Sequence, residues 1–112
     1  MKRLLLLAVL AGAPCMAATN ITATVTAYCG CAKCCGKAGQ PTASGKMPVE
    51  GVTVAGPRRI PFGTRVYIEG VGERVVQDRL ARKYDSRFDV YFQSHQDALE
   101  FGKKTLKITI LD

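Results

Sequence analysis

The stretch Arg87-Phe88-Asp89-Val90-Tyr91-Phe92 carries the clearest strand pattern in this chain of 112 residues. Two phenylalanines and a valine alternate with Asp89 and Tyr91, and this period of two predicts a β-strand with one buried face. Aspartate is depleted in strand interiors, so Asp89 is unusual among aromatic and β-branched neighbours. The stretch therefore predicts both a strand and a carboxyl group that is partly removed from water.

Similar alternation recurs on both sides of this stretch. Further strands are predicted over 20–28, 49–55, 65–69, 73–77 and 105–111, with a hairpin turn at Gly70-Val71-Gly72. One helix is predicted after the N-cap Ser94, and Gly102 ends it. We predict a small all-β protein with six strands and one short α-helix. Closure into a barrel would remove exposed strand edges, although the pattern alone does not distinguish a barrel from a sandwich.

Residues 1–17 are predicted to be a cleaved signal peptide. Lys2 and Arg3 precede an apolar run over 4–13, and small residues follow up to Ala17, where we place the cut. The run is shorter than the ~20 residues that span a bilayer, so no stable membrane insertion is expected. Residues 18–112 are predicted to form a single domain in the periplasm, the cell wall or the extracellular space. Lipidation at Cys15 is the alternative to free secretion.

The charge balance points to an anionic partner. The chain has 16 Lys and Arg against 9 Asp and Glu, a formal charge of +7, and loss of Lys2 and Arg3 with the signal peptide leaves +5. The basic residues are scattered and do not alternate with aromatic residues, so a polymer of the cell envelope is expected rather than nucleic acid. No phosphate-binding loop or dinucleotide motif is present, and no cofactor is expected. We expect a monomer.

Four cysteines, Cys29, Cys31, Cys34 and Cys35, fall within seven residues. An oxidising envelope favours two disulfides, with a pairing that the sequence does not define. The alternative is a soft metal ion such as Zn²⁺ or Cu(I), held by thiolates. The short span of the cluster counts against a metal, and none is expected. His95 is expected on the surface of the predicted helix.

Three aspartates, Asp78, Asp85 and Asp89, fall within one twelve-residue stretch among several arginines. Asp85 lies in a polar loop, where a surface ion pair is the expected role. A carboxyl that is partly desolvated, as we expect for Asp89, has a raised pKa and can act as a general acid. Asp78 ends the preceding predicted strand and could lie beside Asp89, in which case the two would titrate as a coupled pair.

Several segments of the chain resemble the 3D domain family, small exported proteins named for three aspartates. Asp78 and Asp89 lie eleven residues apart, as the two later aspartates of that family do. The chain is also similar to the C-terminal part of lytic transglycosylases of the MltA type. The resemblance implies a double-psi β-barrel and a peptidoglycan substrate. The matching segments, in order, include Thr26-Ala27-Tyr28, Thr42-Ala43-Ser44-Gly45, Ile60-Pro61-Phe62-Gly63-Thr64, Val76-Gln77-Asp78 and Phe88-Asp89-Val90.

The resemblance also implies a reaction and its residues. A lytic transglycosylase cleaves the bond between N-acetylmuramic acid and N-acetylglucosamine and forms a 1,6-anhydro sugar. By position, Asp89 matches the catalytic acid and base, and Asp78 matches the second aspartate. The family's groove residues, which could bind sugar hydroxyls and N-acetyl groups, correspond to Thr26, Tyr28, Thr42 and Ser44.

This chain departs from the family pattern at two places. Gly56 stands where the family has its first aspartate, and Arg79-Leu80-Ala81 stands where the family has a glycine-rich stretch. The first alternative to an enzyme is therefore a barrel that binds peptidoglycan but has lost turnover. The second is an envelope protein that binds metal through its cysteines.

Overall fold

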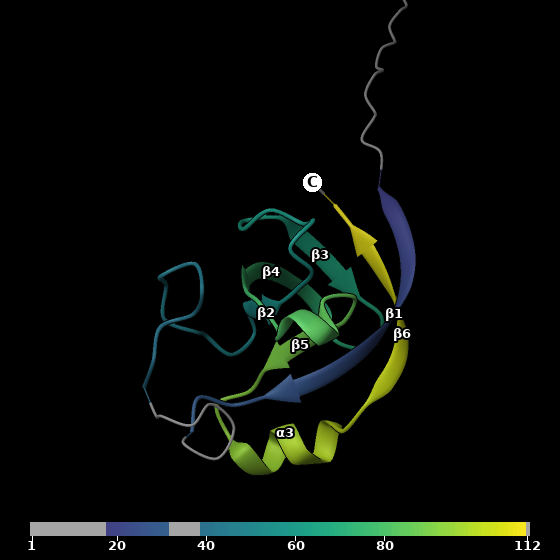
Figure 1. Cartoon of the computed structure of the whole chain (residues 1–112). Helices are drawn as coiled ribbons and strands as arrows, with labels where there is room; N and C mark the ends of the chain where they lie inside the picture. The colour runs from purple at the N-terminus through teal and green to yellow at the C-terminus, as the bar shows by residue number, and fades with distance from the viewer. Residues whose placement is uncertain (1–17, 32–38, 112) are drawn as a thin grey trace, which may run out of the picture.

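Six strands close into a barrel in the computed structural model, which describes residues 18–31 and 39–111. The strands follow one another around the barrel in the order β1-β5-β2-β4-β3-β6 (Figure 1). The predicted signal peptide, Cys34 and Cys35 lie outside the described residues. The strands are β1 (Thr19–Tyr28), β2 (Thr53–Ala55), β3 (Arg65–Ile68), β4 (Gly72–Asp78), β5 (Phe88–Tyr91) and β6 (Lys104–Ile110).

Two parallel strand pairs distinguish this barrel from a simple meander. β1 runs parallel to β5, and β2 runs parallel to β4, whereas the other neighbouring strands are antiparallel. This arrangement confirms the predicted six-stranded barrel and is consistent with the double-psi connectivity that the resemblance implies. Closure pairs both edges of every strand, which removes the exposed edges that an open sheet would leave.

The predicted helix is α3 (His95–Phe101), and it lies at one end of the barrel (Figure 1). The Ser94 side chain accepts a hydrogen bond from the backbone N–H of Asp97, and Gly102 ends the helix with a φ of 72°. Both end signals were predicted, and both are confirmed. A short 3₁₀ helix, η2 (Arg82–Tyr84), follows β4. Across 18–31 and 39–111, no helix is long and apolar enough to cross a bilayer.

The core fills the barrel with the side chains that the alternating patterns place on the inner faces. Burial of one such side chain stabilises the fold by roughly 1.5–3 kcal/mol. Each of the six strands contributes apolar side chains to this core, and in β3 buried Val66 and Ile68 alternate with exposed residues as predicted. β2 differs, because its polar residue Thr53 is buried as well. The core includes Ala23, Val25, Val54, Val66, Ile68, Val76, Phe88, Val90 and Ile108.

The second strand is shorter than its pattern predicts. The alternation extends over 49–55, but β2 spans only Thr53–Ala55. The preceding residues form a tight turn, in which the backbone N–H groups of Val52 and Thr53 both donate to the carbonyl of Val49. Gly51 has a φ of 86°, a conformation that glycine adopts without steric cost. The turn chemistry at Gly51 therefore overrides the strand pattern.

Candidate functional site

Asp89 lies in a row of residues that crosses four adjacent strands. Its β-sheet partners are Thr26 on β1 and Ala55 on β2, and Ala55 is in turn the partner of Asp78 on β4. The register between β2 and β4 shifts between Val54 and Ala55, so that Asp78 takes the position opposite Ala55. Such bulges often redirect a side chain next to a functional site. The two aspartates of the predicted pair are thus brought to the same end of the barrel.

The environment of Asp89 favours its protonated form. Burial raises the pKa of this carboxyl from 3.8 to about 6, and the nearby charge of Asp78 adds to the rise. The opposing influences are a hydrogen bond of 3.0 Å from the Thr26 hydroxyl to Oδ1 and the charge of Arg87. A carboxyl with this pKa is protonated in a large fraction of molecules at mildly acidic pH, so it can donate a proton to a bound substrate.

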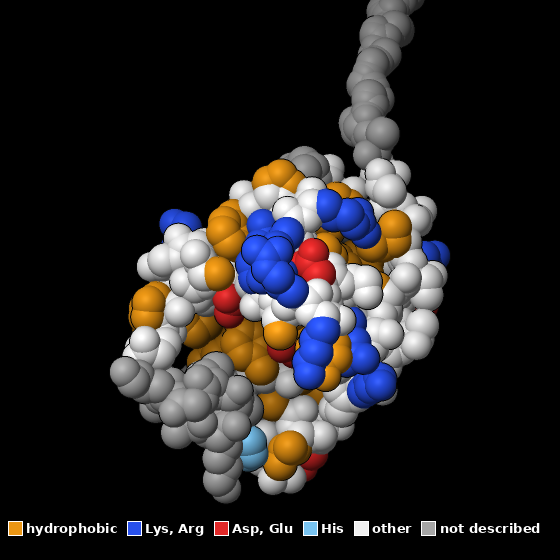
Figure 2. All heavy atoms as spheres, in the orientation of Figure 1, with side chains coloured by type: hydrophobic (Ala, Val, Ile, Leu, Met, Phe, Trp, Pro, Cys, Tyr) orange, Lys and Arg blue, Asp and Glu red, His pale blue; other side chains and the backbone are white. Residues whose placement is uncertain are grey.

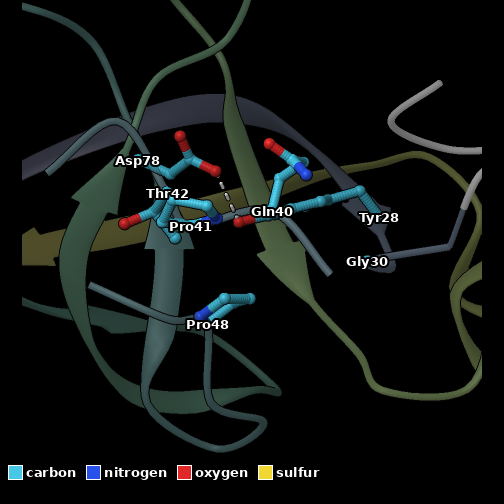
Figure 3. Close-up of a pocket in the computed structure, with 7 residues that line it drawn as sticks. All are labelled: Tyr28, Gly30, Gln40, Pro41, Thr42, Pro48 and Asp78. Atoms are coloured by element: carbon cyan, nitrogen blue, oxygen red, sulfur yellow. Dashed lines mark hydrogen bonds between the residues drawn. The ribbon is translucent and has the colours of Figure 1, made fainter. Parts of the chain in front are cut away.

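Asp78 is held as a hydrogen-bond acceptor by three donors. The Tyr28 hydroxyl donates to Oδ2 over 2.9 Å, and Figure 3 shows this side chain pointing toward Asp78. The backbone N–H groups of Ala43 and Arg79 both donate to Oδ1 over 2.9 Å. These contacts orient the carboxylate and connect β4 to the end of β1 and to the loop that contains Ala43.

Two cavities adjoin the aspartates, and Tyr28 and Asp78 line both of them. The larger cavity has a volume of about 240 Å³ and also reaches Asp89 and Arg79. The smaller cavity, of about 100 Å³, extends past Gly30. The two cavities share Tyr28 and Asp78 as lining residues, and we refer to them together as the groove; Asp89 lines the larger one. Figure 2 shows Lys and Arg side chains gathered beside a hollow on the face of the molecule in view.

The predicted substrate-binding residues lie around the two aspartates, and their polar groups have different partners. The Thr26 hydroxyl donates to Asp89, whereas the Tyr28 hydroxyl donates to Asp78. Thr42 lines the smaller cavity, while its hydroxyl donates to the carbonyl of Lys46 over 2.7 Å and lies 2.9 Å from the Ser44 hydroxyl. The backbone N–H of Ser44 donates to the carbonyl of Gln77 on β4. These contacts shape and anchor the loop, whereas Tyr28 and the carboxylates line the groove directly.

Arg79 has a role that the sequence did not reveal. The sequence showed only that Arg79 begins a segment that departs from the glycine-rich stretch of the family. In the structure, Nη1 of Arg79 donates to the carbonyls of Gly56 and Pro57 over 3.2 and 2.9 Å. Its guanidinium also stacks on the Phe62 ring, 4.1 Å from the ring centroid. Arg79 therefore connects the loop after β4 to the loop after β2, beside the larger cavity.

Gly56, where the family has its first aspartate, is buried against core side chains. A Cβ atom at this position would lie 3.3 Å from the ring of Phe88 and 3.4 Å from Val76. Both contacts are tight, so a larger residue here requires its neighbours to move. Asp85, the remaining aspartate of the stretch, pairs with the Arg58 guanidinium at 2.8 Å. This pair confirms the expected ion-pair role.

The structure corrects the prediction for His95. His95 was expected on the helix surface, but its Nδ1 lies 3.3 Å from the sulfur atoms of both Cys29 and Cys31. The reason is that His95 begins α3, where this helix packs against the end of β1. The two sulfurs lie 2.9 Å apart, beyond the ~2.05 Å of a disulfide bond, so they are not bonded to each other. A disulfide involving Cys34 or Cys35 stays a prediction.

Comparison with known proteins gives the same family assignment as the motifs. A family model described as the 3D domain matches residues 52–112. The cell wall-binding protein YocH of Bacillus subtilis (strain 168) is 35% identical over 100 residues, which cover 86% of this chain and 34% of YocH. The putative cell wall shaping protein YabE of the same strain is 34% identical over 96 residues, covering 82% of this chain and 23% of YabE.

The chain thus spans about a third or less of the length of these two relatives. The family model, in contrast, covers more than half of the chain and includes β2 through β6, with both aspartates of the groove. The relatives match along most of the chain and support the same assignment. This chain belongs to the 3D domain family.

Proposed function

We propose that this protein is an exported lytic transglycosylase of peptidoglycan, with Asp89 as its acid and base. The observation that supports this most directly is the environment of Asp89. Its carboxyl is half-buried in a groove wall, accepts a hydrogen bond from Thr26 and has a pKa raised to about 6. Enzymes commonly use burial in this way to keep a carboxylic acid protonated near its working pH.

In the proposed reaction, protonated Asp89 donates its proton to the glycosidic oxygen between N-acetylmuramic acid and N-acetylglucosamine. The C1–O bond breaks as positive charge develops at C1 of the muramyl sugar. The Asp89 carboxylate then accepts the proton of the muramyl 6-hydroxyl as that oxygen bonds to C1. The product is a 1,6-anhydro sugar, and no water is consumed. One carboxyl can serve in both steps because they occur in sequence.

Asp78 is proposed to support this chemistry without transferring the proton itself. Its two carboxylate oxygens already accept hydrogen bonds from Tyr28, Ala43 and Arg79. Its charge contributes to the raised pKa of Asp89, which lies across Ala55 in the same row. Thr26, Tyr28, Thr42 and Ser44 are proposed to form the surroundings in which the sugar hydroxyls and N-acetyl groups bind.

Export and a cell-wall partner are part of the same proposal. Residues 1–17 would direct export, and residues 18–112 would form the single working domain. A formal charge of +5 on that part of the chain favours an anionic polymer as partner. The relatives are named as proteins that bind or shape the cell wall, which fits peptidoglycan glycan strands as the target.

A peptidoglycan-binding barrel without turnover is the second candidate. Two observations favour it specifically. Gly56 provides no first aspartate, and the space beside it is filled by Phe88 and Val76. One relative is named as a cell wall-binding protein rather than as an enzyme.

Digestion of purified sacculi distinguishes the two candidates. We expect soluble muropeptides with 1,6-anhydro ends, identified by mass spectrometry, after incubation with the protein. Retention on sacculi by co-sedimentation is measured in parallel. Co-sedimentation without any anhydro product would favour the binding barrel, whereas products that carry an added water would indicate a hydrolase.

A further inference from the structure

Three side chains that commonly bind metal ions converge at the end of β1, beside the groove. Cys29 and Cys31 follow β1 directly, and His95 is the first residue of α3. The two sulfurs and the Nδ1 atom of His95 all lie within 4.8 Å of one another. Neither the proposed acid chemistry nor the sugar-binding surface uses these groups, so the cluster needs an explanation of its own.

The distances in this cluster fit a single ion. The sulfurs lie 2.9 Å apart, and each lies 3.3 Å from Nδ1 of His95. A point about 1.3 Å above the plane of this triangle lies about 2.2 Å from all three atoms, close to the Zn–S and Zn–N bond lengths of ~2.3 and ~2.05 Å. The three atoms would move apart by less than about 1 Å to reach the tetrahedral angles that Zn²⁺ prefers.

A hydrogen-bonded trio explains the arrangement less well. The lone pair or N–H of an imidazole nitrogen points in one direction within the ring plane, so it forms a linear bond with one partner. Here Nδ1 is equally distant from two sulfur atoms. An ion placed between the three atoms would contact all of them at once.

We propose that Cys29, Cys31 and His95 bind Zn²⁺. Two thiolates and one neutral imidazole are the ligand types that structural and catalytic zinc sites use, and Zn²⁺ accepts them in tetrahedral geometry. Binding requires both thiols to lose their protons, so two protons are released for each ion bound. Cys29 has no exposed surface, and the positive charge of the ion would offset the cost of burying its thiolate charge.

The backbone places the three proposed ligands close together in the absence of a metal ion. The chain bends at Gly30 and Cys31, and this bend brings the sulfurs of Cys29 and Cys31 to within 2.9 Å of each other. Gly30, between them, passes the ring of Tyr91, where a Cβ atom would lie 3.4 Å from the Tyr91 hydroxyl. The Ser94 cap fixes the first turn of α3 and with it the position of His95.

A bound ion would connect the groove to the helix. Tyr28, which precedes Cys29, donates to Asp78 and packs edge-on against Tyr91 with ring centroids 5.4 Å apart. Gly30 lines the smaller cavity. Zinc would therefore fasten the end of β1 to α3 and hold this wall of the groove in place.

The test measures metal content in the full chain, purified under reducing conditions without chelators. We expect one zinc per chain by elemental analysis and native mass spectrometry, with at least two sulfur ligands and one imidazole in the zinc X-ray absorption spectrum. His95→Gln should lower the zinc affinity at least tenfold. Gln96→Ala, a change at the next residue of the same helix, should keep the wild-type affinity and serves as the matched control.

Thermal unfolding gives a second readout that does not depend on turnover. Zinc should raise the Tm of the wild-type protein by at least about 5 °C and leave that of His95→Gln nearly unchanged. Cys31→Ser should behave like His95→Gln, and this half-buried position avoids the fully buried Cys29. The proposal is overturned if the reduced chain does not take up zinc, or if His95→Gln binds it as tightly as the wild type. Either result leaves the proposed transglycosylase activity untouched.

Discussion

Asp89 and Asp78 lie in the same row of the sheet, but they differ in their hydrogen-bond donors and in their proposed roles. Asp89 accepts a hydrogen bond from one hydroxyl, that of Thr26, whereas Asp78 accepts from a hydroxyl and two backbone N–H groups. Burial raises the pKa of the Asp89 carboxyl, and this carboxyl is the one assigned to proton transfer. This division of roles produces two predictions at the residue scale.

The first prediction concerns the pH dependence of turnover. The acid step requires protonated Asp89, whose pKa is about 6, so release of anhydro sugars should be half-maximal near that pH. Above it, the rate should fall about tenfold for each further pH unit. The measurement is the initial rate of muropeptide release from sacculi between pH 4.5 and 8. A rate that rises through this range would show that the catalytic group acts as a base first.

The second prediction concerns stability. Burial raises the pKa of Asp89 above its ordinary value of 3.8, so its contribution to stability is complete below about pH 4 and is lost as pH rises through about 6. Asp89→Asn should therefore be more stable than the wild type at pH 7.5, by about 1 kcal/mol once partial exposure is allowed for. Denaturant unfolding at pH 7.5 and pH 4 checks this, because the difference should vanish at the lower pH.

Single residues show where sequence reasoning succeeds and where it stops. Asp89 was identified because an aspartate inside an aromatic strand is unusual, and that signal is local. The hydrogen bonds from Arg79 to the loop after β2 were not predicted, because their acceptors, the backbone carbonyls of Gly56 and Pro57, have no sequence signature. His95 was misplaced because helix position alone says nothing of the cysteines that a distant strand brings to it.

At the scale of elements, the loop after β2 is closely packed against the core. Gly56→Ala should destabilise the fold by about 1–3 kcal/mol, because its Cβ atom would meet Phe88 and Val76 at 3.3–3.4 Å. Gly56→Asp should destabilise the fold further and should not increase turnover, since the Cβ atom that carries the added carboxyl would contact apolar side chains. Denaturant unfolding and sacculus digestion measure both effects. A stable and more active Gly56→Asp variant would contradict this packing argument.

Five of the six strands and the helix could be predicted because alternation and end signals are local properties. β2 was overextended, since the glycine turn that shortens it competes with a valid strand pattern. The register shift at Ala55 could not be predicted, because a bulge leaves no trace in hydrophobic periodicity. That shift places Asp78 in the row with Asp89, so the site depends on a feature that only the folded chain reveals.

For the whole molecule, charge should govern the first encounter with the wall. The formal charge of +5 on residues 18–112 predicts that co-sedimentation with anionic sacculi weakens severalfold between 50 mM and 500 mM salt. Chitin, an uncharged glycan, is the control, and its weaker binding should not depend on salt. Binding to sacculi that is unchanged by salt would mean that contacts within the groove dominate retention.

The barrel explains how segments far apart in sequence form one site. β1, β5, β2 and β4 are consecutive neighbours in the strand order of the barrel, and this order brings Thr26, Asp89, Ala55 and Asp78 into one row. The family model covers three of these strands, β2, β4 and β5, with both aspartates. The assignment of turnover rests on Asp89.

The most direct test compares Asp89→Asn with Asp97→Asn in sacculus digestion. Both variants make the same chemical change, and Asp97 lies on α3, away from the groove. We predict that Asp89→Asn releases no 1,6-anhydromuropeptides while remaining folded and bound to sacculi, and that Asp97→Asn releases them at the wild-type rate. Undiminished release by a folded Asp89→Asn variant would contradict the central claim.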